Sequence, residues 1–232
     1  NGVEAALLAQ AGLVSNPDAL EAEHGFADTH MVQNINTNIA LNHLGEYWMF
    51  EEVLHKYHAC CHGLHAAIEA LIKVRDQNNL NAENIKNISI TVAPRYLKIC
   101  NIMAPKTGLE AKFSFRLSAA MVLARRDTAV LSTFSDEACD NRELIALRDQ
   151  VSVSPDPKLS ETEAFVQVQT SDDKILNANF DINQPQTYKI KKEKLMHKAS
   201  ALLGENTACE IWDVISLGDP EKFKTLTQFK LN

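Results

Sequence analysis

The stretch His55–Leu71, HKYHACCHGLHAAIEAL, is the most informative part of this sequence. Its first eleven residues hold one lysine, four histidines and two cysteines. The second half predicts the start of an amphipathic helix over about residues 63–75. The apolar face of that helix consists of Leu64, Ala67, Ile68, Leu71 and Ile72. An ordinary core does not require so many cationic and proton-transferring groups, so we expect any chemistry to lie where this segment meets the helix.

The segments that follow this helix carry the patterns of strands. Residues 87–94, NISITVAP, alternate apolar and polar side chains and stop at a proline, which predicts a half-buried strand. A shorter alternation at residues 151–153 predicts another. The segments AFVQVQT (164–170) and KILNANF (174–180) flank a short polar turn and predict an antiparallel hairpin.

Helical patterns flank this region on both sides. On the N-terminal side, apolar side chains recur at helical spacing over residues 5–13, Asn16–Pro17 favours the start of a short helix, and residues 35–44 predict a third. On the C-terminal side, residues 188–204 predict a helix that ends at a glycine. Two more helices are predicted to start at Thr207, ending at Gly218, and at Asp219–Pro220.

These patterns predict an α+β fold class. A small α+β domain with an antiparallel sheet, residues 47–184, is expected between helical segments of an incomplete all-α domain. Residues 1–46 are predicted to form part of that helical domain, and residues 185–232 to return to it as C-terminal helices.

Composition narrows the class of protein. Of the 232 residues, 45% are hydrophobic, which suits a sizeable core. The net charge of -7 argues against nucleic acid and anionic membranes as partners, and no apolar run reaches membrane-spanning length. The five cysteines are scattered and odd in number, unlike a secreted disulfide framework. We therefore expect a cytoplasmic protein.

Lys56 and two histidines are the first candidates for chemistry. Lys56 lies at the end of a predicted strand, residues 49–57, where it could hold a substrate carboxylate as a point charge. The alternative is a solvated surface lysine, as most lysines are. His65 shares the apolar helix face, so it is either a satisfied core residue or a base oriented by packing. His62 is the second candidate for proton transfer.

The histidines and cysteines of this segment also allow a metal site to be considered. Zinc accepts both ligand types, but their spacing is not that of a paired zinc motif, and no second ligand cluster follows. We expect neither a metal nor another cofactor. The possible ligands are His58, Cys60, Cys61, His62 and His65.

A second group of cations follows the first predicted strand. Thr107 and Glu110 form a capping box that predicts a helix to about residue 125. Lys112 and Arg116, four residues apart on that helix, could face an anionic ligand together. An ordinary solvated face is the alternative.

The stretch KYHACCHGLHAAIEAL resembles the lysine–tyrosine–cysteine–histidine segment of the MmgE/PrpD family, which includes 2-methylcitrate dehydratase and cis-aconitate decarboxylase. Residues 1–26, 44–57 and 101–125 resemble further family segments in the same order, the last with the motif PKTGLEAKFS. The resemblance covers most of the chain and weakens after about Ser132. It implies a large helical domain with a smaller α+β domain, of which this chain would be the second half of a longer protein.

The resemblance also implies roles for individual residues. Lys56 matches an active-site lysine of the family, and His65 matches its histidine. Decarboxylase members carry a histidine where this chain has Cys61 and a tyrosine near Ile99, so the resemblance favours dehydration over decarboxylation. The acidic and histidine residues of the family's N-terminal half are not in this sequence, which puts activity of the chain alone in question.

The expected function is that of a lyase, a hydro-lyase of propionate metabolism that eliminates water from a 2-methylcitrate-like tricarboxylic acid. Two alternatives stay open: a polycarboxylate isomerase or epimerase, and a catalytically silent remnant or obligate subunit. Apolar helix faces near the start, such as Leu7, Leu8 and Leu13, predict a homodimer or other homo-oligomer, or else a partner chain. The expected site residues are catalytic Lys56, His65 and His62, and substrate-binding Cys61, Lys112 and Arg116.

Overall fold

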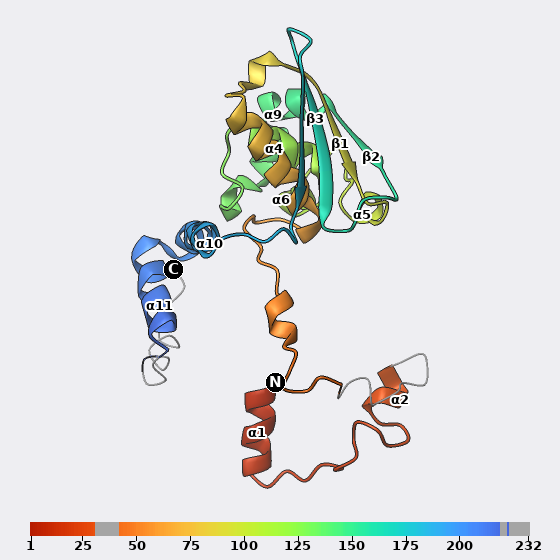
Figure 1. Ribbon diagram of the computed structural model, residues 1–232, viewed down its shortest axis with the longest axis vertical. Coiled ribbons are helices and arrows are strands. Elements are labelled where there is room, and N and C mark those ends of the chain that lie inside the picture. The colour runs from red at the N-terminus through yellow and green to blue at the C-terminus, as the bar shows by residue number, and fades with distance from the viewer. Residues whose placement is uncertain (31–41, 219–221, 223–232) are drawn as a thin grey trace. The chain divides into compact units, whose positions relative to one another are not determined.

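A computed structural model of the chain describes residues 1–30, 42–218 and 222. Contacts divide the chain into two compact units, Asn1–Val53 and Leu54–Asn232 (Figure 1). The predicted boundaries at residues 46/47 and 184/185 stay predictions. No helix in the described part of the chain is long and apolar enough to cross a membrane.

The first unit contains short helices. They are α1 (Gly2–Gln10), α2 (Phe26–His30) and the 3₁₀ helix η1 (Met49–Glu52). The predicted helix after Asn16–Pro17 is wrong, since residues 17–21 form turns. The prediction at residues 35–44 falls outside the described residues apart from a turn at 42–44.

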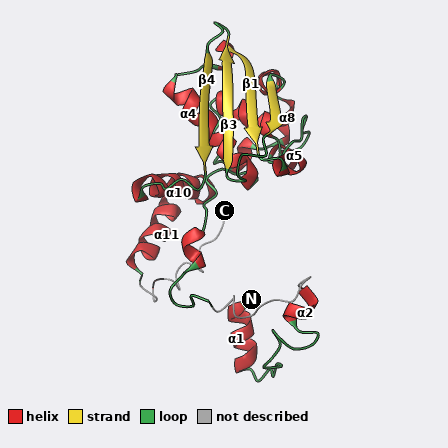
Figure 2. Ribbon diagram, turned by 45° about the vertical axis from the view of Figure 1, so that its right-hand side comes forward, coloured by secondary structure: helices red, strands yellow, loops and turns green. Residues whose placement is uncertain are grey.

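A four-stranded sheet organises the second unit and confirms the α+β class. The strands β1 (Ile85–Val92), β2 (Val151–Pro155), β3 (Glu163–Thr170) and β4 (Ile175–Asp181) lie in the order β2-β1-β3-β4 (Figures 1 and 2). The predicted hairpin is confirmed as the antiparallel pair β3–β4. The prediction of a wholly antiparallel sheet is wrong at one edge, because β2 runs parallel to β1. The helices between β1 and β2 carry the chain back so that both strands run in the same direction, as a parallel pair requires.

The helices of this unit pack on the sheet and on one another. The helix α4 (His65–Gln77) packs against β3 and β4, and α7 (Phe115–Leu123) packs against β2, α4 and α9 (Arg142–Arg148). Alternate residues of the central strands, such as Ile88, Ile90 and Val166, are fully buried beneath them. The shorter helices are η2 (His62–Leu64), η3 (Ala82–Asn84), α5 (Arg95–Ile99), α6 (Gly108–Ala111), η4 (Leu131–Thr133) and α8 (Asp136–Asp140).

The predicted continuous helix from Thr107 to about residue 125 is wrong. The Thr107 cap is present, since its hydroxyl accepts the Glu110 N–H at 3.2 Å, but α6 ends at Ala111. Ser114 then begins α7 by accepting the N–H of Leu117, and its hydroxyl donates to a distant carbonyl, that of Ile102. Because of this break, the two predicted cations no longer share one helix face: Lys112 lies at the end of α6 and Arg116 in α7.

The C-terminal helices α10 (Tyr188–Leu203) and α11 (Glu205–Leu217) pack against each other. The predicted stops at Gly204 and Gly218 are confirmed, and both glycines have positive φ, where other residues are strained. The predicted cap at Thr207 is wrong, since α11 already begins at Glu205. The helix predicted from Asp219 lies outside the described residues.

Candidate functional site

The segment that carries the candidate residues is an irregular loop. The predicted strand at residues 49–57 is wrong: η1 is followed by extended and bent backbone up to η2. Backbone hydrogen bonds nevertheless fix the loop, because Ala59 N–H donates to Thr128 O at 2.8 Å and Cys61 N–H donates to Lys112 O at 3.0 Å. Thr128 and Lys112, which are far from the loop in sequence, therefore hold it in place through their carbonyl groups.

His65 ties this loop to α4 from inside the core. Only 1% of the residue is exposed. Its Nε2 accepts the backbone N–H of His58 at 3.2 Å, and its Nδ1 lies 3.1 Å from the carbonyl oxygen of Cys61. This pairing requires a proton on Nδ1 and none on Nε2. Burial, helped by the neighbouring charge of His58, lowers the pKa of His65 to about 3. The ring is therefore neutral, and both its nitrogens are engaged with backbone.

A cavity of about 450 Å³ opens beside the loop. Lys56, Lys112 and Lys198 line it together with Cys61, and the described residues around it include no carboxylate side chain. A volume of this size is within the range of small-molecule sites. Three ammonium groups without a lining counter-charge make this cavity suited to a small molecule with several negative charges. Its full lining is Lys56, His58, Ala59, Cys60, Cys61, Leu109, Lys112, Phe113, Leu131 and Lys198.

The titratable groups around the cavity respond to burial and to these lysines. Burial raises the pKa of the Cys60 thiol to about 12, despite the opposing charge of Lys56, so this thiol stays protonated. Burial and then the charge of Lys56 lower the pKa of His62. Its Nε2 is shielded from solvent and has no hydrogen-bond partner in the described part of the chain. His62 is therefore a neutral imidazole beside the loop lysine with one uncommitted ring nitrogen.

A buried polar chain runs behind the loop. The carboxylate of Glu69 in α4 accepts a hydrogen bond from the Lys194 ammonium of α10 at 2.6 Å. The same carboxylate lies 3.4 Å from His58 Nε2. His58 Nδ1 lies 2.7 Å from the hydroxyl of Thr128. Burial alone would raise the pKa of Glu69, but the bonds with His58 and Lys194 outweigh it and lower that pKa. Glu69 is thus a charged carboxylate that joins the loop to α10.

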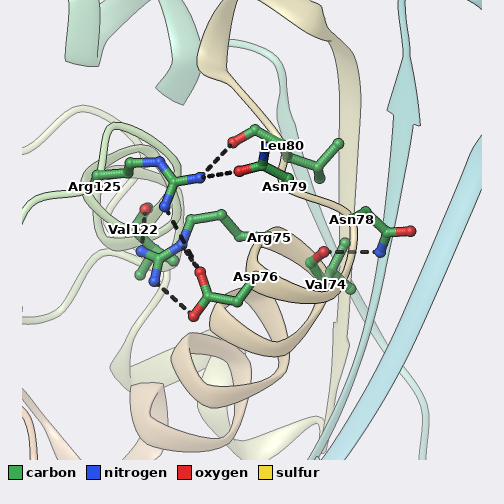
Figure 3. Close-up of polar contacts among 8 residues, drawn as sticks. All are labelled: Val74, Arg75, Asp76, Asn78, Asn79, Leu80, Val122 and Arg125. Carbon is green, nitrogen blue, oxygen red and sulfur yellow. Dashed lines mark hydrogen bonds and ion pairs between the residues drawn. The ribbon is translucent and has the colours of Figure 1, made fainter.

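A second cavity, also about 450 Å³, is lined by His58, Glu69 and Lys194 of this chain, and two of the three arginines on its wall connect parts of the fold. Figure 3 shows Arg75 and Arg125 both directed at the carboxylate of Asp76. Arg75 donates to Asp76 and to the carbonyl of Val122 at 2.9 Å, so it joins α4 to the end of α7. Arg125 donates to the carbonyl of Leu80 at 3.3 Å. Both guanidinium groups are occupied by partners of the chain itself.

The structure brings some of the predicted site residues together and separates others. Lys56, Cys61 and Lys112 line one cavity, and His62 follows directly along the loop. His65 lies behind the loop in the core. Arg116 lies elsewhere, where its guanidinium donates to the carbonyl of Val151 at the start of β2. These assignments of function stay predictions.

Two residues of this region, Glu69 and Lys198, carry no role in the sequence reasoning, and His58 appears there only as a possible metal ligand. Lys198 lies four residues after Lys194, so both were visible as one face of the lysine-rich helix at residues 188–204. That spacing is equally typical of a solvated face. Among the described residues, no group of three or more histidine, cysteine, aspartate or glutamate side chains could hold a metal ion.

The structure is thus an α+β domain with a cavity lined by three lysines. A family comparison identifies residues 58–211, more than half of the chain, with the MmgE/PrpD C-terminal domain. The chain belongs to the MmgE/PrpD family, as the sequence resemblance implied. A search of curated proteins found no match.

Proposed function

We propose that this protein is a lyase whose lysine-lined cavity binds a 2-methylcitrate-like tricarboxylic acid and eliminates water from it. The observation that carries the proposal is the cavity lined by Lys56, Lys112 and Lys198, with no carboxylate among its described lining residues. A tricarboxylic acid would neutralise these charges, whereas a neutral metabolite would leave them repelling one another. Membership of the MmgE/PrpD family supports the reaction class.

Elimination removes a proton from the carbon next to a carboxylate and breaks the bond between the neighbouring carbon and its hydroxyl group. The hydroxyl takes up a proton from solvent and leaves as water as the carbon–carbon double bond forms, and the base later returns its proton to solvent. Lys56 would hold the carboxylate and stabilise the negative charge that develops on it as the proton leaves. His62, next to Cys61 of the lining, would accept the proton, since its Nε2 has no partner among the described residues. His65 would act as a positioning residue, because its nitrogens already bind the loop backbone. Cys61 and Lys112 would contact substrate.

Proton NMR of the chain with 2-methylcitrate, citrate and cis-aconitate tests the proposal. We expect vinylic or methylene signals of the product to change with time, together with ultraviolet absorbance from the new double bond. Lys56→Ala should abolish turnover, and His62→Asn should lower kcat by roughly 100-fold or more, the usual contribution of a general base. Lys73→Ala, which removes an exposed lysine of α4, is the matched control and should leave turnover unchanged.

The alternative functions would give different results in the same NMR and ultraviolet measurements. An isomerase or epimerase would exchange the substrate's carbon-bound proton with solvent deuterium without new ultraviolet absorbance. A silent remnant or an obligate subunit would give no turnover in the chain alone. Either result would overturn dehydration as an activity of this chain.

We also propose that the chain associates with a copy of itself or with a partner chain. No residue of α1 is buried, and Leu7 and Leu8 expose about half of their surface. Apolar patches of this kind normally become interfaces. Sedimentation at tens of micromolar, roughly where weak interfaces fill, should show a species larger than a monomer. The five free cysteines support a reducing compartment such as the cytoplasm.

A further inference from the structure

Lys198 reaches the cavity from a different part of the chain than the other lysines. Lys56 lies on the loop before α4 and Lys112 at the end of α6, whereas Lys198 comes from α10. Its ammonium donates to the carbonyl oxygen of Ala129 at 2.9 Å. A lysine has three donors, so this bond orients the ammonium and leaves two donors for a ligand.

Two neighbouring contacts hold α10 where Lys198 can reach the cavity. One turn earlier, Lys194 binds the buried carboxylate of Glu69 at 2.6 Å. Next to it, His197 Nε2 lies 2.9 Å from the carboxylate of Asp127. Lys198 is thus the third of three residues on one side of α10 that contact the α+β core, and it is the only one of the three on the wall of the three-lysine cavity.

The position of Lys198 is electrostatically unfavourable without a ligand. Burial is the main cause that lowers its pKa, and the charges of Lys56 and Lys112 lower it further, while Cys60 and Asp127 oppose the shift. Like charges that converge on one cavity repel, and an anion between them relieves that repulsion. Each lysine can then bind a separate carboxylate of the same ligand.

We propose that Lys198 is a specificity-determining residue that binds the third carboxylate of the ligand, so that the cavity discriminates tricarboxylates from dicarboxylates. The inference rests on the proposed function for the class of substrate, but it concerns binding and not turnover. Removing Lys198 should therefore weaken the binding of tricarboxylates much more than the binding of dicarboxylates of the same chain length.

Calorimetric binding of two unreactive probes tests this inference. Tricarballylate carries three carboxylates, and glutarate is a dicarboxylate of equal chain length that lacks the central one. Lys198→Met should lower the affinity for tricarballylate by about 10- to 100-fold, the loss typical of a charge-assisted hydrogen bond. The affinity for glutarate should fall by no more than about threefold. Lys198→Arg should restore most of the preference, since it returns the charge. Lys191→Met removes an exposed lysine of the same helix and should change neither affinity.

The outcomes separate the inference from the proposed function. Equal weakening of both probes, or none, in a folded Lys198→Met would overturn the third-carboxylate role and leave the lyase proposal standing. Binding of tricarballylate with no turnover of any hydroxy acid would support the inference and count against the lyase. Failure of the unmodified chain to bind tricarballylate would overturn both. Lys198→Gln, with thermal unfolding followed in parallel, provides a second variant should the methionine variant misfold.

Discussion

The side chain of His65 accepts a hydrogen bond from the backbone N–H of His58, at 3.2 Å, and pairs through its other nitrogen with the carbonyl of Cys61. One buried imidazole thus closes both ends of the segment that precedes η2. This segment, residues 58–61, includes Cys61 of the three-lysine cavity and begins two residues after Lys56. The geometry of the candidate site therefore depends on a side chain that does not line the cavity.

His65→Asn should destabilise the chain by about 2–4 kcal/mol, because it leaves two buried backbone groups without full partners. Chemical denaturation with urea measures this change. His30→Asn, at an exposed histidine of α2, should alter the free energy of unfolding by less than about 0.5 kcal/mol. Equal stability of the His65 variant and the unmodified chain would contradict the bracing role.

The same histidine should make stability depend on pH. Its pKa is about 3 in the folded chain, against 6.5 for an unperturbed histidine, so the unfolded chain binds more protons between these values. The stabilisation is complete above about pH 6.5 and is lost as the pH falls towards 3, by up to roughly 1.4 kcal/mol per pH unit. Between pH 7 and pH 5, the unmodified chain should lose about 2 kcal/mol more than His65→Asn does. Parallel losses in the two proteins would show that His65 does not cause the effect.

The sheet and the central helix could be predicted because their signals are local. Alternation in NISITVAP and the apolar face of α4 each lie within a dozen residues, and both elements are confirmed. The parallel strand β2 could not be oriented from its own residues, since its direction depends on the path of the connection from β1. The break after α6 likewise depends on Ser114 donating to Ile102, a contact that periodicity does not report.

The candidate site was predictable only in part for the same reason. The density of histidine, cysteine and lysine pointed to the loop that lines the cavity, and Lys56, Cys61 and Lys112 do meet there. The position of Lys198 at the cavity could not be predicted, because its spacing in a lysine-rich helix is that of a solvated face. Only the structure shows that its ammonium donates to the Ala129 carbonyl. Arg116 shows the converse: its spacing from Lys112 suggested a shared anion site, and the guanidinium binds Val151 instead.

Gly63 in η2, directly before α4, is required by close packing. A Cβ built on this residue would lie 2.4 Å from two ring carbons of Tyr96 and 3.2 Å from the Cys100 sulfur. Gly63→Ala should therefore destabilise the chain by about 1–3 kcal/mol, the usual cost of overpacking. Combining it with Tyr96→Ala should recover part of that loss in a double-mutant cycle. Gly2→Ala, where a Cβ would meet nothing within 4 Å, is the control; additive effects of the Gly63 and Tyr96 changes would contradict the clash.

Glu69 couples the loop to α10, so its substitution should affect both stability and ligand affinity. Glu69→Gln keeps the shape of the side chain but removes the charge that binds Lys194, which should cost about 1.5–3 kcal/mol, the contribution of a charged hydrogen bond. Because the lowered pKa of Glu69 stabilises the folded chain above the ordinary carboxyl range, this loss should shrink as the pH falls below about 4.

A less firmly held α10 should also place Lys198 less well, and tricarballylate affinity should fall by several-fold while glutarate affinity changes less. Glu83→Gln, at an exposed position of η3, controls for the loss of one negative charge. Loss of stability with no change in the preference between the two probes would mean that Lys198 keeps its place without the Lys194–Glu69 bond.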